Sequence, residues 1–89
     1  MGSVRWRLEI ARRAHRDIAN LPSLVRRRIL GSFEGLTATP RTGDIKKLAA
    51  ADNDYRLRVG DYRVLFTVHG HERTVEITGI RHQSSAYER

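Results

Sequence analysis

The chain has 89 residues, and a chain of this length forms one hydrophobic core, so we expect a single domain over residues 1–89. It has no cysteine, which excludes disulfides and thiolate metal sites, and its 39% hydrophobic and 30% charged residues are typical of folded proteins. The formal net charge is +7, and arginines supply 15 of the 17 basic residues. Because guanidinium groups match phosphate oxygens, this balance indicates an anionic partner, either nucleic acid or an acidic protein segment.

Neither a membrane span nor a metal site is expected from this sequence. No stretch approaches the ~20 apolar residues that a span needs, so we expect a soluble, cytoplasmic protein with no membrane partner. The four histidines lack the paired spacing of zinc ligands, so we expect no metal.

The first half of the chain predicts a strand followed by two helices. Residues 4–9 alternate apolar and charged side chains, which is typical of a half-buried strand. Apolar residues at helical spacing follow over 10–21, up to Pro22, which cannot continue the preceding helix. A second helix begins at Pro22 or Ser23 and ends before Thr39, and the short link between the helices favours an antiparallel pair.

Basic residues also occur in the second helix and in the segment after it. The arginine run over 26–28 is more typical of a solvated helix face than of a nucleic-acid contact. Residues 40–54 are rich in turn-forming residues, and we expect an exposed connection there with a short turn over 45–50. This connection carries Lys46 and Lys47.

The last third of the chain changes to the two-residue period of strands. We expect strands over 55–59, 62–68 and 73–80, with a glycine-first type II′ turn at Gly60–Asp61. Consecutive strands joined in this way form an antiparallel meander. The predicted fold class is therefore α+β: an N-terminal strand, a two-helix antiparallel hairpin and a three-stranded antiparallel meander, with the helices on one face of the sheet.

The two-residue turn also predicts which residues of its two strands face each other. Arg58 is expected opposite Arg63, with Arg56 on the same side, while the alternate residues form an apolar face for the helices. The second face is then expected to be open and cationic. Like charges in direct opposition destabilise a sheet by up to about 1 kcal/mol, which indicates a function unless acidic side chains neutralise them. The candidates for neutralisation are Asp52, Asp54, Asp61 and Glu76.

Three further side chains with useful chemistry lie near the C-terminus. Arg81 can hold a phosphate, His82 can move a proton and Tyr87 can stack on a base. Strict alternation would put Arg81 on the apolar side, so it reaches the cationic face only if the strand ends or bulges near Gly79. The alternatives are an ordinary surface histidine and a tyrosine that packs against the core.

In combination these features resemble the RelE/ParE toxin superfamily over nearly the whole chain. The matching segments are Leu21–Pro22, Arg28–Leu30, Lys46–Leu48, the run from Tyr55 to Phe66, and Arg81, His82 and Tyr87. In that superfamily two helices cover one face of an antiparallel sheet. RelE-type members are toxins of type II toxin–antitoxin systems that cleave messenger RNA in the ribosomal A site and so inhibit translation.

The resemblance implies a metal-independent endoribonuclease without a cofactor, in which a ribose 2′-hydroxyl attacks the adjacent phosphate and leaves a 2′,3′-cyclic phosphate. It implies a catalytic group of two phosphate-binding arginines, a proton-transferring histidine and a substrate-orienting tyrosine: Arg63, Arg81, His82 and Tyr87. It implies an RNA-binding group as well: Lys46, Lys47, Arg56 and Arg58. Some relatives have lysine at positions 56 and 58, and because arginine hardly acts as a base, the general base stays unassigned, with Asp52 and Asp54 as exposed alternatives.

Two other functions are compatible with these features. ParE-type members share the fold but poison DNA gyrase without cleaving RNA, and a third alternative is a non-catalytic basic module that binds RNA or the ribosome. The terminal arginine, histidine and tyrosine together with Arg63 favour the nuclease. The superfamily also implies a cognate antitoxin as partner, and the net charge of +7 suits an acidic antitoxin segment.

Overall fold

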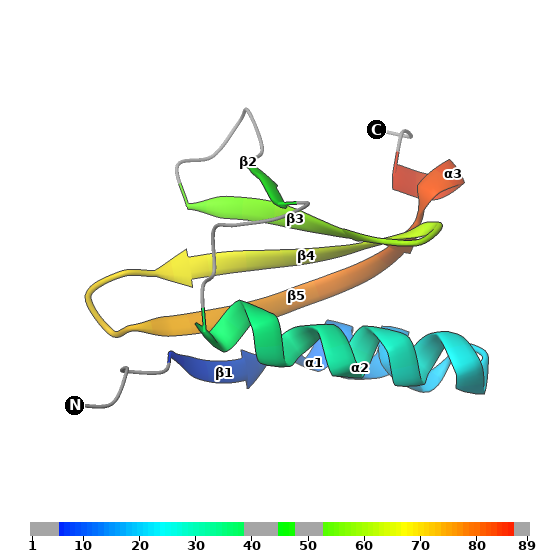
Figure 1. Ribbon diagram of the computed structural model, residues 1–89, viewed down its shortest axis with the longest axis horizontal. Coiled ribbons are helices and arrows are strands. Elements are labelled where there is room, and N and C mark those ends of the chain that lie inside the picture. The colour runs from blue at the N-terminus through cyan, green and yellow to red at the C-terminus, as the bar shows by residue number, and fades with distance from the viewer. Residues whose placement is uncertain (1–5, 39–44, 48–52, 87–89) are drawn as a thin grey trace.

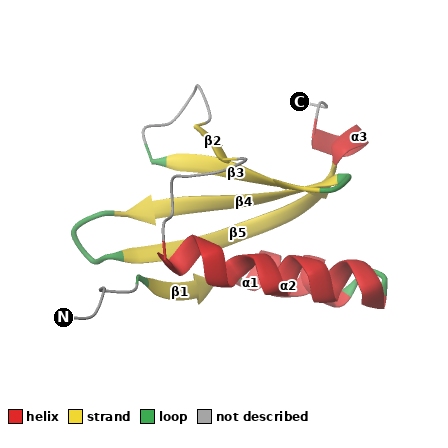
Figure 2. Cartoon of the chain, viewed as in Figure 1, coloured by secondary structure: helices red, strands yellow, loops and turns green. Residues whose placement is uncertain are grey.

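The structure, a computed structural model, describes residues 6–38, 45–47 and 53–86. Its elements follow in the order β1 (Arg7–Ile10), α1 (Arg12–Ala19), α2 (Ser23–Ala38), β2 (Ile45–Lys47), β3 (Asp54–Val59), β4 (Tyr62–His69), β5 (Thr74–His82) and α3 (Gln83–Ala86). The strands form one five-stranded sheet in the order β1-β5-β4-β3-β2, in which β1 is parallel to β5 and the other pairs are antiparallel (Figure 1). Figure 2 shows the two long helices on the same side of the sheet.

The predicted α+β class and the β3-β4-β5 meander are confirmed, while several element boundaries differ. The first strand continues to Ile10, which pairs with Ile77, so α1 begins at Arg12; residues 4 and 5 of the predicted strand lie outside the described residues. The expected turn over 45–50 was wrong at Ile45–Lys47, because this segment pairs with β3 as a fifth strand. The last strand continues to His82, and α3 was not predicted.

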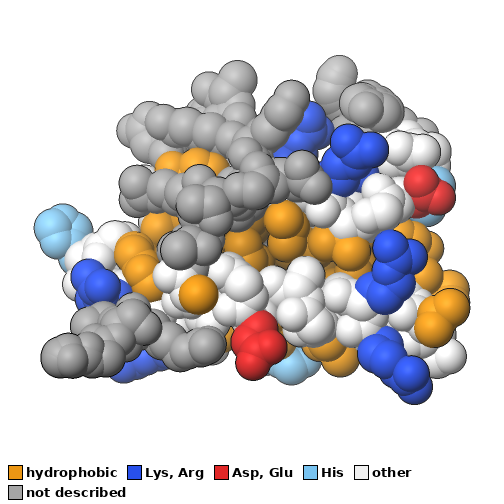
Figure 3. All heavy atoms as spheres, viewed as in Figure 1, with side chains coloured by type: hydrophobic (Ala, Val, Ile, Leu, Met, Phe, Trp, Pro, Cys, Tyr) orange, Lys and Arg blue, Asp and Glu red, His pale blue; other side chains and the backbone are white. Residues whose placement is uncertain are grey.

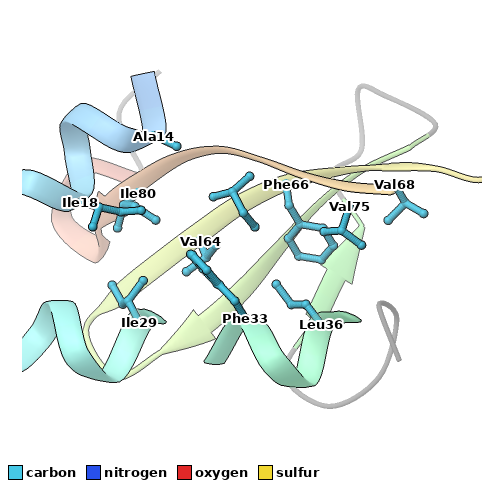
Figure 4. Close-up of a cluster of buried hydrophobic side chains, with 11 residues drawn as sticks. Ala14, Ile18, Ile29, Phe33, Leu36, Val64, Phe66, Val68, Val75 and Ile80 are labelled. Carbon is cyan, nitrogen blue, oxygen red and sulfur yellow. The ribbon is translucent and has the colours of Figure 1, made fainter. Parts of the chain in front are cut away.

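One apolar core lies between the sheet and the helices. Its helical side chains are Ala14 and Ile18 from α1 and Ile29, Phe33 and Leu36 from α2. Strands β4 and β5 supply the opposing side chains: Val64, Phe66, Val68, Val75, Ile77 and Ile80. Figure 4 shows the side chains of the two layers pointing toward each other. Both helices therefore cover one face of the sheet, as predicted. Among the described residues, none of the helices has the length and apolar character of a membrane span.

The turn between β3 and β4 has the register that the sequence predicts. Gly60 has φ +58°, in the left-handed region that favours glycine and suits the first position of a type II′ turn. Val59 accordingly faces Tyr62, and Arg58 faces Arg63. The side chains of β3 and β4 therefore fall on the two faces expected from the sequence.

A bulge interrupts the pairing of β4 with β5. Leu65 pairs with Gly79 and Phe66 with Ile77, so Thr78 is the extra residue, and its hydroxyl donates a hydrogen bond of 3.2 Å to the Leu65 carbonyl. The extra residue shifts the alternation of β5 by one position beyond Thr78. Each residue of β5 after the bulge therefore lies on the opposite face from the one that strict alternation would give it. As a result, Arg81 lies on the same face as Arg63.

Candidate nucleic-acid interface

Three arginines lie abreast on the sheet face turned away from the long helices. Arg58 on β3 is opposite Arg63 on β4, and Arg63 is in turn opposite Arg81 on β5. We call these three residues the arginine row. Directly opposed residues on neighbouring strands have Cβ atoms about 5 Å apart, so three cationic side chains leave the same face of the sheet from adjacent positions.

The guanidinium of Arg63 is held by the turn beside it. Its Nη1 donates hydrogen bonds of 3.2 Å to the Gly60 carbonyl and 3.0 Å to the Tyr62 carbonyl. Arg63 is only 9% exposed, so the expectation of an open face was wrong at this position. The physical reason is that Arg63 lies on the central strand with an arginine on either side, and its guanidinium bends back onto the turn carbonyls.

The guanidinium of Arg81 is held by an acidic residue of α1. Its Nη1 lies 3.3 Å from Asp17 Oδ2 and also donates a 3.3 Å hydrogen bond to the Ile80 carbonyl. The same Asp17 oxygen accepts a 2.9 Å hydrogen bond from the Ile80 N–H. One carboxylate therefore contacts both the backbone and the side chain at the end of β5.

Arg63 and Arg81 keep most of their donors for a ligand. A guanidinium has five N–H groups, and within the described part of the chain the hydrogen bonds of the Arg63 and Arg81 side chains involve Nη1 alone. The Nε and Nη2 groups remain, and their fork matches two oxygens of a phosphate. Arg58 is exposed, and no ion pair involves it within the described part of the chain. The arginine row can therefore offer several N–H donors to one anionic group.

None of the acidic residues expected to neutralise the row does so where the structure describes them. Asp54 accepts a 2.7 Å hydrogen bond from Thr67, Glu76 contacts His69 at 2.9 Å, and Asp61 forms no ion pair among the described residues. Asp52 lies outside the described residues. The acidic partner found is Asp17, which the sequence did not suggest because the contact to Arg81 spans 64 positions.

The same face is acidic at its other end. Asp54, Thr67, Glu76 and Glu9 lie in register across β3, β4, β5 and β1. His69 and Glu76 form an ion pair there, and the pKa of His69 is raised, chiefly by its hydrogen bond to the Glu76 carboxylate. No group of three potential ligands for a metal ion occurs among the residues that the structure describes. An anionic ligand is therefore directed to the arginine row and away from this end.

The positive end of the face coincides with the β3–β4 turn. Arg28 of α2 reaches this turn, with its guanidinium against Gly60, and borders a groove lined by Val25, Val59 and Asp61. Figure 3 shows much of the visible Lys and Arg surface at the end of the molecule where Figure 1 places this turn and the start of α2. The cationic surface therefore continues from the sheet to the helical layer.

His82 lies next to the arginine row in sequence but points the other way. It pairs with Tyr62, which lies on the helix side of the sheet, and the two rings meet edge to face at 5.1 Å. Its Nδ1 accepts a 3.3 Å hydrogen bond from the Ser84 N–H and lies 3.0 Å from the Ser84 hydroxyl. An accepting Nδ1 leaves the hydrogen of the neutral ring on Nε2, which faces away from Ser84 and can donate it.

The remaining candidate residues are described only in part. Arg56 lies on the same face as the arginine row, two residues from Arg58 along β3, and is half-buried. The backbone of Lys46 pairs with Arg56, and that of Lys47 with Tyr55, so β2 brings both lysine positions to the edge of this sheet. Tyr87 lies outside the described residues. The structure thus unites Arg56 with the arginine row, places the lysine positions on the neighbouring strand and sets His82 at the end of β5.

Comparison with known proteins agrees with the fold and with these features. The family described as "ParE toxin of type II toxin-antitoxin system, parDE" matches residues 8–87. The protein named "Putative toxin RelE1" from Methanocaldococcus jannaschii is 30% identical over 94% of this chain and 97% of its own length.

Solved structures of toxin–antitoxin complexes have the same fold. A chain of the toxin–antitoxin complex RelBE2 from Mycobacterium tuberculosis has a TM-score of 0.80 at 25% identity, covering 89% of this chain and 99% of that one. A chain of the RelB–RelE complex from Methanococcus jannaschii has a TM-score of 0.74 at 28% identity, covering 90% and 95%. The fold and the family match together define a toxin of the type II toxin–antitoxin class. The chain belongs to the ParE toxin family, within the RelE/ParE superfamily.

Proposed function

We propose that this protein is a RelE-type toxin that cleaves messenger RNA in the ribosomal A site. The observation that carries the proposal is the arginine row, in which two guanidinium groups are anchored through Nη1 and keep their Nε and Nη2 donors. Donors held in place before the substrate binds stabilise a developing charge without reorganisation in the transition state. The similarity to "Putative toxin RelE1" and to the RelE-containing structures supports the same function.

In the proposed reaction the RNA supplies both the attacking and the leaving oxygen, and the general base stays unassigned. The ribose 2′-oxygen forms a bond to the adjacent phosphorus while the bond from phosphorus to the 5′-oxygen breaks. The 2′-hydroxyl loses its proton to a base, and the leaving 5′-oxygen gains one. Arg63 and Arg81 bind the oxygens of the five-coordinate phosphorus, where the negative charge increases, and Arg58 and Arg56 bind the RNA backbone beside it.

His82 is the proposed source of the proton for the 5′-oxygen. The step uses the imidazolium form of the ring, in which Nδ1–H donates to the Ser84 hydroxyl 3.0 Å away and Nε2–H gives its proton to the 5′-oxygen, leaving the neutral ring. Since its ring lies at the end of β5 and on the side of Tyr62, the leaving nucleotide has to pass over the end of the sheet to meet it. Tyr87 is proposed to orient the substrate, and Lys46 and Lys47 to bind RNA at the β2 edge.

A cognate antitoxin is the proposed protein partner. The solved relatives include RelB–RelE antitoxin–toxin complexes, and the net charge of +7 on this chain suits an acidic segment of such a partner. A neighbouring small acidic protein that restores growth when both are expressed would identify it.

Gyrase poisoning is the second candidate function, because the matching family is described as the ParE toxin. A purely protein-binding toxin has no need for three arginines abreast on the sheet, which favours the nuclease. The two functions are separated by incubating the purified toxin with programmed ribosomes and, in parallel, with gyrase and supercoiled DNA. Cleavage of the ribosome-bound RNA with unaffected gyrase supports the proposal. Inhibited gyrase with intact RNA supports the alternative, and ribosome binding without either effect indicates a non-catalytic module.

A further inference from the structure

We propose that Asp17 is a positioning residue that holds the Arg81 guanidinium in the arginine row, an inference that rests on the proposed nuclease function. Asp17 lies on α1, in the helical layer, whereas Arg81 lies on the opposite face of the sheet. The contact between them is possible because α1 lies beside the edge of β5.

One edge of β5 pairs with β1 only as far as Ile77. Up to that residue β1 pairs with β5, and the pairing ends with Ile10 opposite Ile77. The chain then turns into α1, whose first residues follow at once, and the N–H of Ile80 donates to Asp17 instead of to a strand. An exposed strand edge has unpaired N–H groups, so Asp17 satisfies one that β1 no longer reaches.

The carboxylate reaches around this edge to the other face. A methyl group placed on Gly79 would lie 3.4 Å from Asp17 Oδ2 and 3.4 Å from Arg81 Nη1. Both distances are ordinary van der Waals contacts, so the carboxylate and the guanidinium meet directly beside Gly79. Both groups are partly buried, with side chains 25% and 27% exposed, so bulk water screens their attraction less than at an open surface.

Holding Arg81 matters because its neighbours repel it. Arg63 is directly opposite and Arg58 lies one strand further, so an untethered Arg81 side chain would turn toward solvent to separate the charges. Asp17 supplies the opposing attraction through Nη1 alone and leaves Nε and Nη2 for a phosphate. Arg63 is held in a similar way by two backbone carbonyls, so Arg63 and Arg81 each have an anchored Nη1.

The test compares Asp17→Asn with Arg81→Ala and with the double variant. Asparagine keeps an oxygen for the Ile80 N–H and loses the charge that attracts Arg81. Glu34→Gln, an exposed residue of α2, is the matched control for the change in net charge. Single-turnover cleavage on programmed ribosomes is measured together with ribosome affinity and thermal stability.

We expect Asp17→Asn to lower the cleavage rate by about 10-fold, with ribosome affinity close to that of Glu34→Gln, because a misplaced donor affects the transition state more than binding. In the Arg81→Ala background the same substitution should have no further effect. A wild-type rate in folded Asp17→Asn would overturn the inference, and so would a 10-fold loss that persists without Arg81.

A second readout does not depend on cleavage. In ¹⁵N NMR spectra the Nε–Hε signal of Arg81 should be resolved in the wild type and in Glu34→Gln, and should shift toward that of a mobile arginine in Asp17→Asn. If the wild type cleaves no RNA, the proposed function fails and this signal alone decides whether Asp17 positions Arg81. An unchanged signal in Asp17→Asn contradicts the positioning role.

Discussion

Arg63 and Arg81 lie directly opposite each other on β4 and β5, although strict alternation along β5 would place them on different faces of the sheet. The extra residue at Thr78 removes this conflict, because it allows both Ile77 and Ile80 to be buried before Arg81 emerges on the face of Arg63. The cationic site is therefore a product of the backbone pairing as much as of the residue types.

Replacing Arg63 or Arg81 by alanine should abolish most of the toxicity. Each is proposed to stabilise charge on the phosphate, and loss of one such donor lowers a rate by about 10²- to 10³-fold. Growth after induced expression measures the effect, with the protein level checked in each culture. Full growth arrest by either folded variant would remove these arginines from the site.

Phe66→Ala provides the contrasting control for those two variants. Phe66 is 1% exposed and lies in the core, so its truncation should lower the free energy of unfolding by about 3–5 kcal/mol. Leu30, at 44% exposure, should lose less than about 1 kcal/mol on the same substitution. Denaturant unfolding of the four proteins separates loss of the site from loss of the fold.

Arg58→Thr should make the domain more stable and less toxic at the same time. The substitution removes one of two like charges in direct opposition, and we expect the free energy of unfolding to rise by up to about 1 kcal/mol at low salt. The gain should diminish as added salt screens the repulsion. A variant that is less stable than the wild type at low salt would show that the row is not under electrostatic strain.

The ion pair of His69 and Glu76 predicts a pH-dependent stability. The pKa of His69 is raised in the folded protein. The stabilisation that the ion pair adds is therefore fully present below about pH 6.5, the ordinary pKa of histidine in an unfolded chain. The contribution is lost as the pH rises through the folded pKa. The difference in free energy of unfolding between wild type and His69→Gln should therefore be largest below about pH 6.5 and shrink as the pH rises above it. A difference that is constant or increases over that range would contradict the assigned pair, and His71→Gln, an exposed residue of the adjoining turn, is the matched control.

His82→Gln should slow single-turnover cleavage by about 10²- to 10⁴-fold and leave ribosome affinity nearly unchanged, if Nε2 donates the proton to the 5′-oxygen. A histidine acid gives a rate that falls with rising pH, whereas a base gives one that rises. The pH–rate profile of the wild type on ribosomes distinguishes the two. Identical rates and profiles in the variant would leave the proton chemistry to Arg81 and Tyr87.

The sequence predicted the β3–β4 register because a two-residue glycine turn leaves little freedom in pairing, so Arg58 opposite Arg63 followed directly. It also indicated a bulge near Gly79 as the condition for Arg81 to join the row, and the bulge lies at Thr78. Both inferences depended on local chain geometry.

Features that depend on distant segments were not predicted. β2 is only three residues long, too short for an alternating pattern, and its pairing is decided by the neighbouring β3. The burial of Arg63 follows from the path of its side chain over the turn, and the role of Asp17 from the place where β1 ends. The first depends on the side-chain conformation of Arg63, which a residue pattern does not give, and the second on a contact between segments 64 positions apart.

The proposed nuclease activity can be read from the end groups of messenger RNA after incubation with the toxin on programmed ribosomes. We expect a 2′,3′-cyclic phosphate and a free 5′-hydroxyl at a cut in the A site, formed about 10²- to 10³-fold more slowly by Arg63→Ala. A 2′-deoxy nucleotide at the cut position should prevent the reaction. Intact RNA with the folded wild-type toxin, or cleavage that survives the 2′-deoxy substitution, would contradict it.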